Sequence, residues 1–271
     1  MRLSRILLYL VLCIFSLFFL FPVYVLLTTS FKTIAEFSAG LWALPGSFNL
    51  DGYRQALASG MGQGILNSLK MTIPAGVISA VLSSLTGYVF SKYQNVWINL
   101  ILSLIVLGMF IPYQVVLIPL VQFMAKLGLY NTYFGLILTH VAYGLPICTL
   151  IFTNHYASIP NDLLEAARID GCGVWGVYTK VMLPLSISAF VVTLIWQFTS
   201  VWNDFLFGRT LSQGPGVRPA TVTLAGLKGT FTANWNVQMA GAIMTAFPTL
   251  LLYLVLGKYF VRGLLSGSVK G

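Results

Sequence analysis

Charged residues are scarce in this sequence. Only 8% of its 271 residues are charged, and only six of those are acidic, whereas a soluble domain carries roughly a quarter of its residues as charged side chains. A chain this poor in charge cannot cover a water-facing surface. The composition therefore excludes an ordinary soluble globular domain.

Cysteine and histidine, which serve as metal ligands and catalytic groups, are scarcer still. The three cysteines, Cys13, Cys148 and Cys172, are too scattered for a disulfide framework or a metal cluster. Neither His140 nor His155 has a neighbouring cluster of ligand-type residues, and no phosphate loop of the form Gly-x4-Gly-Lys-Ser/Thr is present. We expect no metal site, no enzyme activity and no ATP hydrolysis by this chain alone, and we interpret His140 as a hydrogen-bonded packing residue.

Long apolar runs are what the sequence has instead, and 58% of its residues are hydrophobic. A helix needs about 20 residues to cross the core of a bilayer. Six runs reach that length: residues 6–29, 66–90, 97–119, 133–157, 183–208 and 238–262. The first has no small-x-small cleavage site, so we interpret it as a retained helix. We predict an all-α membrane protein with six transmembrane helices and a single domain over residues 1–271.

The basic residues are spread singly between these runs, although the net charge is +9. A nucleic-acid-binding protein concentrates them on one face, so we expect membrane lipid and a charged partner surface rather than nucleic acid. Basic residues close to span ends favour the cytoplasm. On one side of the membrane these are Arg2, Arg5, Lys92, Lys180, Lys258 and Arg262. This arrangement favours a cytoplasmic position for both termini.

One polar segment, residues 158–182, interrupts the apolar runs. It holds three of the six acids of the chain, Asp162, Glu165 and Asp170. Acids favour the first turns of a helix, where the macrodipole attracts negative charge. We therefore predict a short helix that begins near residue 160, followed by a second one over residues 174–180.

The start and end of the first short helix have their own signals. Pro160 suits the first turn because it has no N–H to satisfy, and Ser158 or Asn161 could cap the helix. The small residues Ala166 and Gly171 would let another chain approach closely. We interpret the segment as a helix–turn–helix projection at the membrane surface, while a solvated, capped loop would explain its charges equally well.

The order of residues in this segment is specific. Glu165, Ala166 and Ala167 are followed after three intervening residues by Gly171, and after nine further intervening residues by Val181, one residue, and then Leu183 and Pro184. This order resembles the signature loop of bacterial ABC importer permeases, with Val181 in place of the usual isoleucine.

The resemblance extends over essentially the whole chain and points to the carbohydrate-uptake, maltose-type branch of that family. The stretches that carry it are residues 67–69, 88–93, 111–112, 118–119, 127–132, 202–205 and 257–264. Residues 195–207 look most like permeases for glucose, mannose or short glucosides. The resemblance implies a type I ABC importer permease fold with a cytoplasmic coupling helix, in the inner membrane of a bacterium or archaeon.

The resemblance also implies partners. They are a second homologous permease that completes a heterodimer, two cytoplasmic ATPase subunits that bind ATP and Mg, and an extracytoplasmic sugar-binding protein. This chain would bind no cofactor itself. The residues that would couple it to the ATPase are Glu165, Ala166, Ala167, Asp170, Gly171, Leu183 and Pro184. In related permeases the C-terminal tail reaches the ATPase interface, which makes Lys270 and Gly271 candidate contacts, although a frayed tail is an equal alternative.

A sugar pathway needs aromatic faces and a few hydrogen-bonding groups in apolar walls. The candidates that offer these groups are Trp196, Gln197, Trp202, Asn203, Asp204, Asn67 and Gln114. Asp204 is a rare intramembrane acid, and such acids usually face a cavity or a partner. We expect it to have a structural or gating role ahead of direct sugar binding, through capping a helix end or pairing with Arg209.

Other functions are less well supported by the residues. A permease for another small polar solute, such as a polyol or glycerol phosphate, is the nearest alternative. An ion-coupled secondary carrier would need repeated halves and ionisable residues along a pathway. The chain offers only Asp204 and His140 for that purpose.

Overall fold

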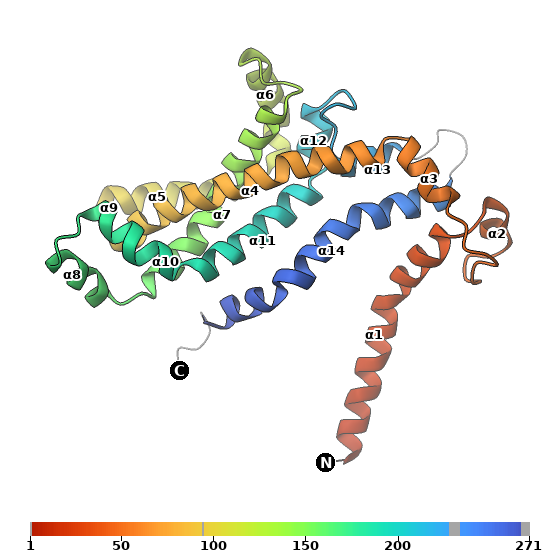
Figure 1. Ribbon diagram of the computed structural model, residues 1–271, viewed down its shortest axis with the longest axis horizontal. Coiled ribbons are helices and arrows are strands. Elements are labelled where there is room, and N and C mark those ends of the chain that lie inside the picture. The colour runs from red at the N-terminus through yellow and green to blue at the C-terminus, as the bar shows by residue number, and fades with distance from the viewer. Residues whose placement is uncertain (1, 94, 228–233, 267–271) are drawn as a thin grey trace. The chain divides into compact units, whose positions relative to one another are not determined.

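Helices form all the regular structure in the part of the chain that the computed structural model describes, residues 2–93, 95–227 and 234–266 (Figure 1). The chain is therefore all-α, as predicted. The helices in order are α1 (Arg2–Ser30), α2 (Ile34–Ala39), α3 (Asp51–Ala58), α4 (Met61–Lys92), α5 (Val96–Gly108), α6 (Tyr113–Lys126), α7 (Tyr133–Ala157), α8 (Asn161–Ile169), α9 (Val174–Val177), the π-helical η1 (Tyr178–Met182), α10 (Leu183–Leu185), α11 (Ile187–Asn203), α12 (Leu206–Leu211), α13 (Ala220–Gly226) and α14 (Trp235–Ser266).

Four of the described helices are long and apolar enough to cross a membrane: Arg5–Ser30, Met61–Lys92, Tyr133–Ala157 and Trp235–Gly257. Two bent pairs of helices raise the number to as many as six if each pair is one span. Several helices are longer than the apolar runs that predicted them, since a helix can extend beyond the hydrocarbon core of the bilayer. The four continuous spans and two bent ones fit the six predicted runs.

The predicted third span, residues 97–119, is not one straight helix. Its two parts, α5 and α6, meet at 99°. Pro112 lies at the N-cap of α6 with φ −61° and ψ 119°. Proline has no N–H for an intrahelical hydrogen bond and disfavours the helical conformation of the residue before it, so α5 cannot continue through this point.

The predicted fifth span, residues 183–208, differs at both ends. The helices on either side of Ser186 are bent by 73°, because Pro184 cannot donate to the carbonyl one turn earlier. At the other end α11 stops at Asn203, since Asp204 has the extended values φ −63° and ψ 135°. Residues 206–211 form the separate helix α12.

The described residues group into two compact units. The first comprises residues 1–65 and 220–248, and its core contains Ala56, Met61, Ala220 and Val237. Its helices approach closely at Gly52, where a Cβ would lie 2.8 Å from the carbonyl oxygen of Asn236. A glycine at this position allows α3 to pack against the start of α14.

The second unit comprises residues 66–219 and 249–271 and holds both features that bear on function. It has two apolar cores. One gathers around Tyr88, Phe152, Tyr156, Tyr178 and Met182, where α4 and α7 meet η1. The other gathers around Met71, Met124, Leu136, Val201 and Leu211, where α4 and α7 meet α6, α11 and α12.

Candidate functional site

A cavity of about 1200 Å³ opens between the bent α5–α6 pair, α7 and α11, within the second unit. Its wall is mostly apolar, with a few polar groups supplied by Thr86, His140, Thr149, Ser200, Asn203 and Asp204. Aromatic side chains line it as well: Tyr113, Tyr143, Trp196, Phe205 and Phe207. An apolar wall with a few convergent polar groups and aromatic faces is typical of sites that bind small polar organic molecules.

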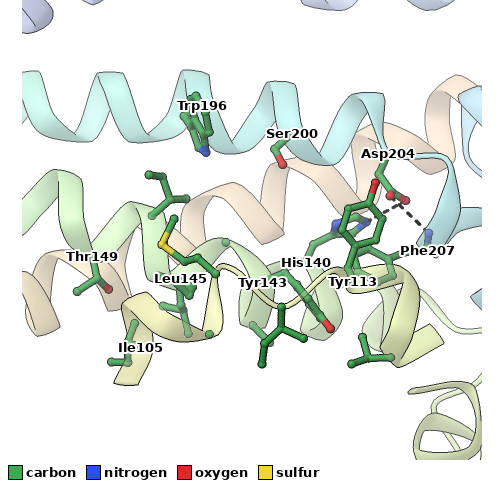
Figure 2. A pocket seen from close by; sticks show the side chains of 18 of the residues that line it. Ile105, Tyr113, His140, Tyr143, Leu145, Thr149, Trp196, Ser200, Asp204 and Phe207 are labelled. Carbon is green, nitrogen blue, oxygen red and sulfur yellow. Dashed lines mark hydrogen bonds and ion pairs between the residues drawn. The ribbon is translucent and has the colours of Figure 1, made fainter. Parts of the chain in front are cut away.

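One stripe of α11 forms a side of the cavity. Trp196, Ser200 and Asn203 are four and three residues apart, so they project from the same face of the helix. Figure 2 shows Trp196 and Ser200 facing Leu145 and Tyr143 of α7 across the opening. The Trp196 ring is about half exposed, at 49%, and is therefore available to a ligand.

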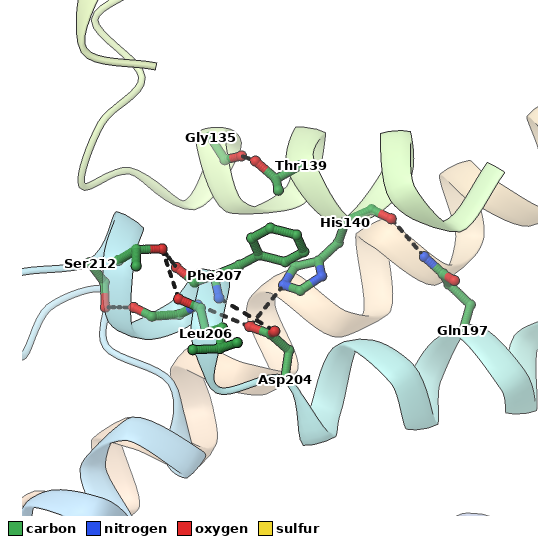
Figure 3. Close-up of polar contacts among 10 residues, drawn as sticks. Gly135, Thr139, His140, Gln197, Asp204, Leu206, Phe207 and Ser212 are labelled. Atoms are coloured by element: carbon green, nitrogen blue, oxygen red, sulfur yellow. Dashed lines mark hydrogen bonds and ion pairs between the residues drawn. The ribbon is translucent and has the colours of Figure 1, made fainter. Parts of the chain in front are cut away.

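Asp204 lies at one end of the cavity and holds the start of α12 (Figure 3). Its Oδ2 accepts a hydrogen bond from the amide of Gly208 at 2.9 Å, and its Oδ1 accepts one from the amide of Phe207 at 3.4 Å. A carboxylate at this position satisfies amides that have no intrahelical partner. Asp204 therefore caps α12, the helix that follows it. Capping a helix end was one of the two structural roles expected for this residue.

His140 of α7 faces the same carboxylate. Its Nε2 lies 3.9 Å from Asp204 Oδ2, and the two side chains are only 5% and 12% exposed. That distance is too long for a direct hydrogen bond. The acid beside His140 comes from the residue that directly follows α11.

An aromatic cluster closes this end of the cavity around Phe207. The Phe207 ring centroid lies 4.9 Å from that of Tyr143, 5.5 Å from that of Tyr113 and 5.7 Å from that of His140. Contacts of this kind each stabilise an aromatic pair by about 0.5–1.5 kcal/mol beyond burial. The start of α12 is thus fixed to α6 and α7.

Gln197 does not line the cavity; it is buried where three helices meet, at 1% exposed. Its Nε2 donates to the Oγ of Ser79 in α4 at 3.2 Å and to the carbonyl oxygen of His140 in α7 at 2.9 Å. A Cβ at Gly144 would overlap the Gln197 amide. This position makes Gln197 a contact between α4, α7 and α11.

Asn67 is likewise buried and has backbone partners. Its Nδ2 donates to the carbonyl oxygens of Pro215 and Arg218, both at 2.9 Å, and its Oδ1 accepts from the Tyr133 hydroxyl at 2.6 Å. These bonds fix the segment between α12 and α13 to α4 and α7. Trp202 is fully buried and stacks on Phe198. Gln114 is exposed on α6. None of these three residues lines the cavity.

The polar segment 158–182 forms a projection beyond the end of α7, made of α8, the turn at Gly171, α9 and η1 (Figure 1). Gly171 has φ +83°, so it makes the predicted turn. The face that points outward carries Glu165, Ala166 and Asp170 together with the apolar side chains of Leu163, Ile169 and Trp175. Among the predicted coupling residues, Pro184 is also exposed, whereas Ala167 is buried and Leu183 packs against the core.

Polar contacts fix the projection to the long helices. The Nζ of Lys92, at the end of α4, donates to the carbonyl oxygen of Ile159 at 2.7 Å and to Asn161 Oδ1 at 2.9 Å. Deeper in the unit, the hydroxyl of Ser84 lies 2.6 Å from that of Tyr156 and 2.9 Å from that of Tyr178. A displacement of the projection would therefore be transmitted to α4 and α7.

The predicted capping of α8 by Ser158 or Asn161 is wrong. No side chain caps this helix, because both candidates have other partners. The Ser158 hydroxyl donates to the carbonyl oxygen of His155 at 2.7 Å, and Asn161 Oδ1 accepts from Lys92. The helix instead begins directly after Pro160 and ends at Ile169.

The sequence reasoning missed several residues of the cavity. Ser200 had a signal, since it lies four residues after Trp196 on the same face of α11. Tyr113 and Phe207 had none, because they reach the cavity through the bend before α6 and the separate helix α12. The predicted tail contacts, Lys270 and Gly271, lie outside the residues that the structure describes.

Residues 73–265 match the family model described as "Binding-protein-dependent transport system inner membrane component". This chain belongs to that family. The match covers the cavity and the projection, and it makes the chain a membrane-embedded transport component rather than an enzyme.

Named relatives agree with the family match. A probable ABC transporter permease protein from Pyrococcus horikoshii is 50% identical over 197 residues, which are 72% of this chain and 64% of that protein. The glucose import system permease protein GlcU from Saccharolobus solfataricus is 31% identical over 97% of this chain and 95% of its own length. The chain is thus related to ABC transporter permeases along nearly its whole length.

A solved structure shares the fold. The permease aligns with a chain in the crystal structure of a bacterial ABC transporter involved in the import of the acidic polysaccharide alginate, with a TM-score of 0.83, 22% sequence identity and coverage of 96% and 97% of the two chains. The permease therefore has the fold of an ABC importer membrane subunit, as the resemblance implied.

Proposed function

We propose that this permease forms part of the membrane pathway of an ATP-driven sugar importer that carries a mono- or short oligosaccharide, with glucose, mannose or a glucoside favoured. The cavity carries the proposal. Its exposed Trp196 ring and the hydroxyls of Ser200 and Tyr143 suit the C–H faces and hydroxyl groups of a sugar. The glucose permease related to this chain supports the same class of solute.

The cavity favours a neutral solute over a phosphorylated one. None of the described residues that line it is a lysine or an arginine, and Asp204 contributes an acid. Phosphate groups in proteins are normally held by cations or by helix N-termini. Here the amides at the start of α12 already donate to Asp204. Glycerol phosphate is therefore a poorer candidate than a sugar or a neutral polyol.

Coupling to ATP would occur at the projection. Its outward face combines the acids Glu165 and Asp170 with Leu163, Ile169 and Trp175, and such a mixture of charged and apolar side chains fits a protein partner better than water. We expect the partner to be an ATPase subunit that binds ATP and Mg, with Glu165 facing a basic residue on it. Coupling requires that the ATPase binds the two states of the permease with different free energies.

The rest of the assembly follows from the same proposal. A second homologous permease would complete a heterodimer, two ATPase subunits would lie on the cytoplasmic side, and a binding protein would deliver the sugar from outside. The projection would then be cytoplasmic, and so would both termini. Basic side chains near the same membrane face, Lys92, Arg168 and Lys180, support this orientation.

The test is uptake by the complete transporter in proteoliposomes, with radiolabelled glucose, mannose, a short glucoside and a polyol supplied to the binding protein. We expect Trp196→Ala to lower the uptake of the preferred sugar about fivefold, because an aromatic contact contributes about 1 kcal/mol. The affinity of the binding protein for the sugar should not change. The matched control is Trp97→Ala, since Trp97 is exposed on α5 but is not part of the cavity wall.

Three results would contradict the proposal. Equal uptake by the Trp196 and Trp97 variants would show that the cavity is not the pathway. Uptake of a polyol in preference to every sugar would show that the solute class is wrong. Unchanged uptake in the absence of ATPase subunits would show that transport is not driven by ATP.

A further inference from the structure

The segment between α1 and α3, residues 31–50, has its charges turned inward. Lys32 and Glu36 are its only charged residues. Lys32 is 1% exposed, and its Nζ donates to the carbonyl oxygens of Gly40 at 3.0 Å and Leu41 at 2.9 Å. A buried ammonium group is tolerated because it is hydrogen-bonded in this way.

The carboxylate of Glu36 is also satisfied within the segment. Its Oε2 accepts from the amide and the hydroxyl of Thr33 at 2.8 Å and 3.1 Å, and its Oε1 accepts from the amide of Gly46 at 3.0 Å. The amides of Thr33 and Gly46 hold the pKa of Glu36 below its usual value. Both charges of the segment are thus used to close its own loop.

The large apolar side chains of the same segment point outward. Ile34 is 58% exposed, Trp42 61%, Leu44 71% and Phe48 83%. Burying such a side chain is favourable by about 1.5–3 kcal/mol relative to leaving it in water. In a water-facing loop the charged groups are exposed and the apolar side chains are buried, whereas here Lys32 is buried, Glu36 is half-buried and hydrogen-bonded within the loop, and the large apolar side chains are exposed.

Contacts place Trp42 beside the membrane helix rather than beyond it. The Tyr24 hydroxyl donates to the carbonyl oxygen of Trp42 at 2.9 Å, and the ring centroids of Phe21 and Trp42 are 5.1 Å apart. Tyr24 and Phe21 precede the end of α1 at Ser30 by six and nine residues, which at 1.5 Å per residue is roughly 9 and 14 Å. The chain therefore folds back along α1.

The surface of α1 at this level is itself apolar and exposed. The most apolar window of Arg5–Ser30 has a mean hydropathy of 2.8, and none of it is buried in the structure. Trp42 and its exposed neighbours continue this lipid-compatible surface sideways from the helix. Tryptophan and tyrosine are enriched at the boundary between lipid headgroups and acyl chains.

We propose that residues 31–50 are embedded in the lipid leaflet at the C-terminal end of α1, with Trp42 as an anchor at the boundary between headgroups and acyl chains. The partner is the lipid itself, because no exposed charge is offered to a protein and the apolar surface is continuous with that of a membrane span. The anchor fixes the level of α1 in the bilayer. This proposal does not depend on which solute the permease carries.

Bromine on lipid acyl chains quenches tryptophan emission on contact, which gives a direct test. The assembled transporter is placed in phosphatidylcholine vesicles whose lipid is either unmodified or brominated in the upper acyl chain. The emission of Trp42 is obtained as the difference between the wild type and Trp42→Phe. We expect brominated lipid to remove more than about half of this difference emission, and aqueous iodide to leave it unchanged.

The matched control is Trp175→Phe, since Trp175 in the projection is 66% exposed and its emission should not respond to brominated lipid. Phe48→Trp, made in the wild type, provides a second reporter that should respond as Trp42 does. Quenching of the Trp42 emission by iodide would place the segment in water. Emission that responds to neither quencher would mean that a protein surface covers it, and either result would overturn the proposal.

Discussion

At the scale of single residues, Gly171 combines a required backbone conformation with open space. Its φ of +83° lies in the left-handed region, where side chains other than glycine are strained. No atom lies within 4 Å of the position of an added Cβ. A side chain at this position would therefore strain the backbone of the turn without colliding with a neighbouring atom.

We predict that Gly171→Ala destabilises the turn between α8 and α9 by about 1–2 kcal/mol and lowers sugar uptake per ATP hydrolysed. The variant should still reach the membrane in normal amounts. Gly173→Ala is the matched control, because Gly173 has φ −71° and also has open space around it. Uptake and ATP hydrolysis measured in the same proteoliposomes check this, and a Gly173 variant with an equal or larger defect would argue against it.

Helix geometry decided which residues of the cavity could be predicted from the sequence. The sequence identified Trp196, Asn203 and Asp204 because they lie on one continuous helix or directly at its end. It could not place Gln197, whose partners Ser79 and His140 come from two other helices. Contacts between distant helices have no signature in the spacing of a single segment.

At the scale of elements, apolar length predicted the spans well, whereas a proline in the sequence does not by itself indicate where a span bends. Pro112 and Pro184 accompany bends of 99° and 73°. Pro74, Pro146 and Pro248 lie inside the helices α4, α7 and α14. A neighbouring helix can satisfy the carbonyl that a proline leaves without a partner, so the outcome depends on packing that the sequence does not display.

The contact between the end of α4 and the base of the projection yields a prediction for Lys92. Replacing it by methionine keeps the length of the side chain but removes its hydrogen bonds to Ile159 and Asn161. Because each of the two bonds contributes about 1 kcal/mol, we expect the loss of both to lower uptake roughly thirtyfold, while ATP hydrolysis persists.

The matched control for Lys92→Met is Lys126→Met, since Lys126 is exposed at the end of α6, away from the projection. Both variants are assayed for uptake and for hydrolysis stimulated by the binding protein. An identical uptake for the two would show that the hydrogen bonds of Lys92 do not transmit the motion of the projection.

At the scale of the whole molecule, the class of protein could be predicted because two independent features of the sequence agree. The composition indicates that the chain lies in a membrane, and the order of residues 165–184 indicates a surface that binds a partner. The fold then follows from the family match over residues 73–265 and the shared architecture with an importer subunit. The solute preference that we propose depends on side chains brought together from six helices, α4, α5, α6, α7, α11 and α12, and the spacing within one segment does not display such a set.

The Gln197 contacts predict how the second unit moves. Since one amide links α4, α7 and α11, and Gly144 leaves no room for another side chain, we expect these helices to move as one rigid body. Spin labels at Val77 and Leu138, exposed on α4 and α7, should keep their separation within about 2 Å when ATP is added.

The labels would be introduced with Cys13 and Cys172 replaced by serine, because these two cysteines are not buried, whereas Cys148 is. Pulsed electron paramagnetic resonance on the assembled transporter, with and without ATP, measures the distance between the labels. A change of more than about 2 Å between Val77 and Leu138 on addition of ATP would rule out the rigid body.

The cap at Asp204 has a consequence for genetic screens of this permease. Because its carboxylate holds the first amides of α12, a loss-of-transport allele at this codon reports the misplacement of a helix before it reports anything about the solute. An allele that changes which sugar supports growth would be informative, whereas one that abolishes growth on every sugar would not. Screens for altered preference should therefore begin at Trp196 and Ser200, whose side chains line the cavity without capping a helix.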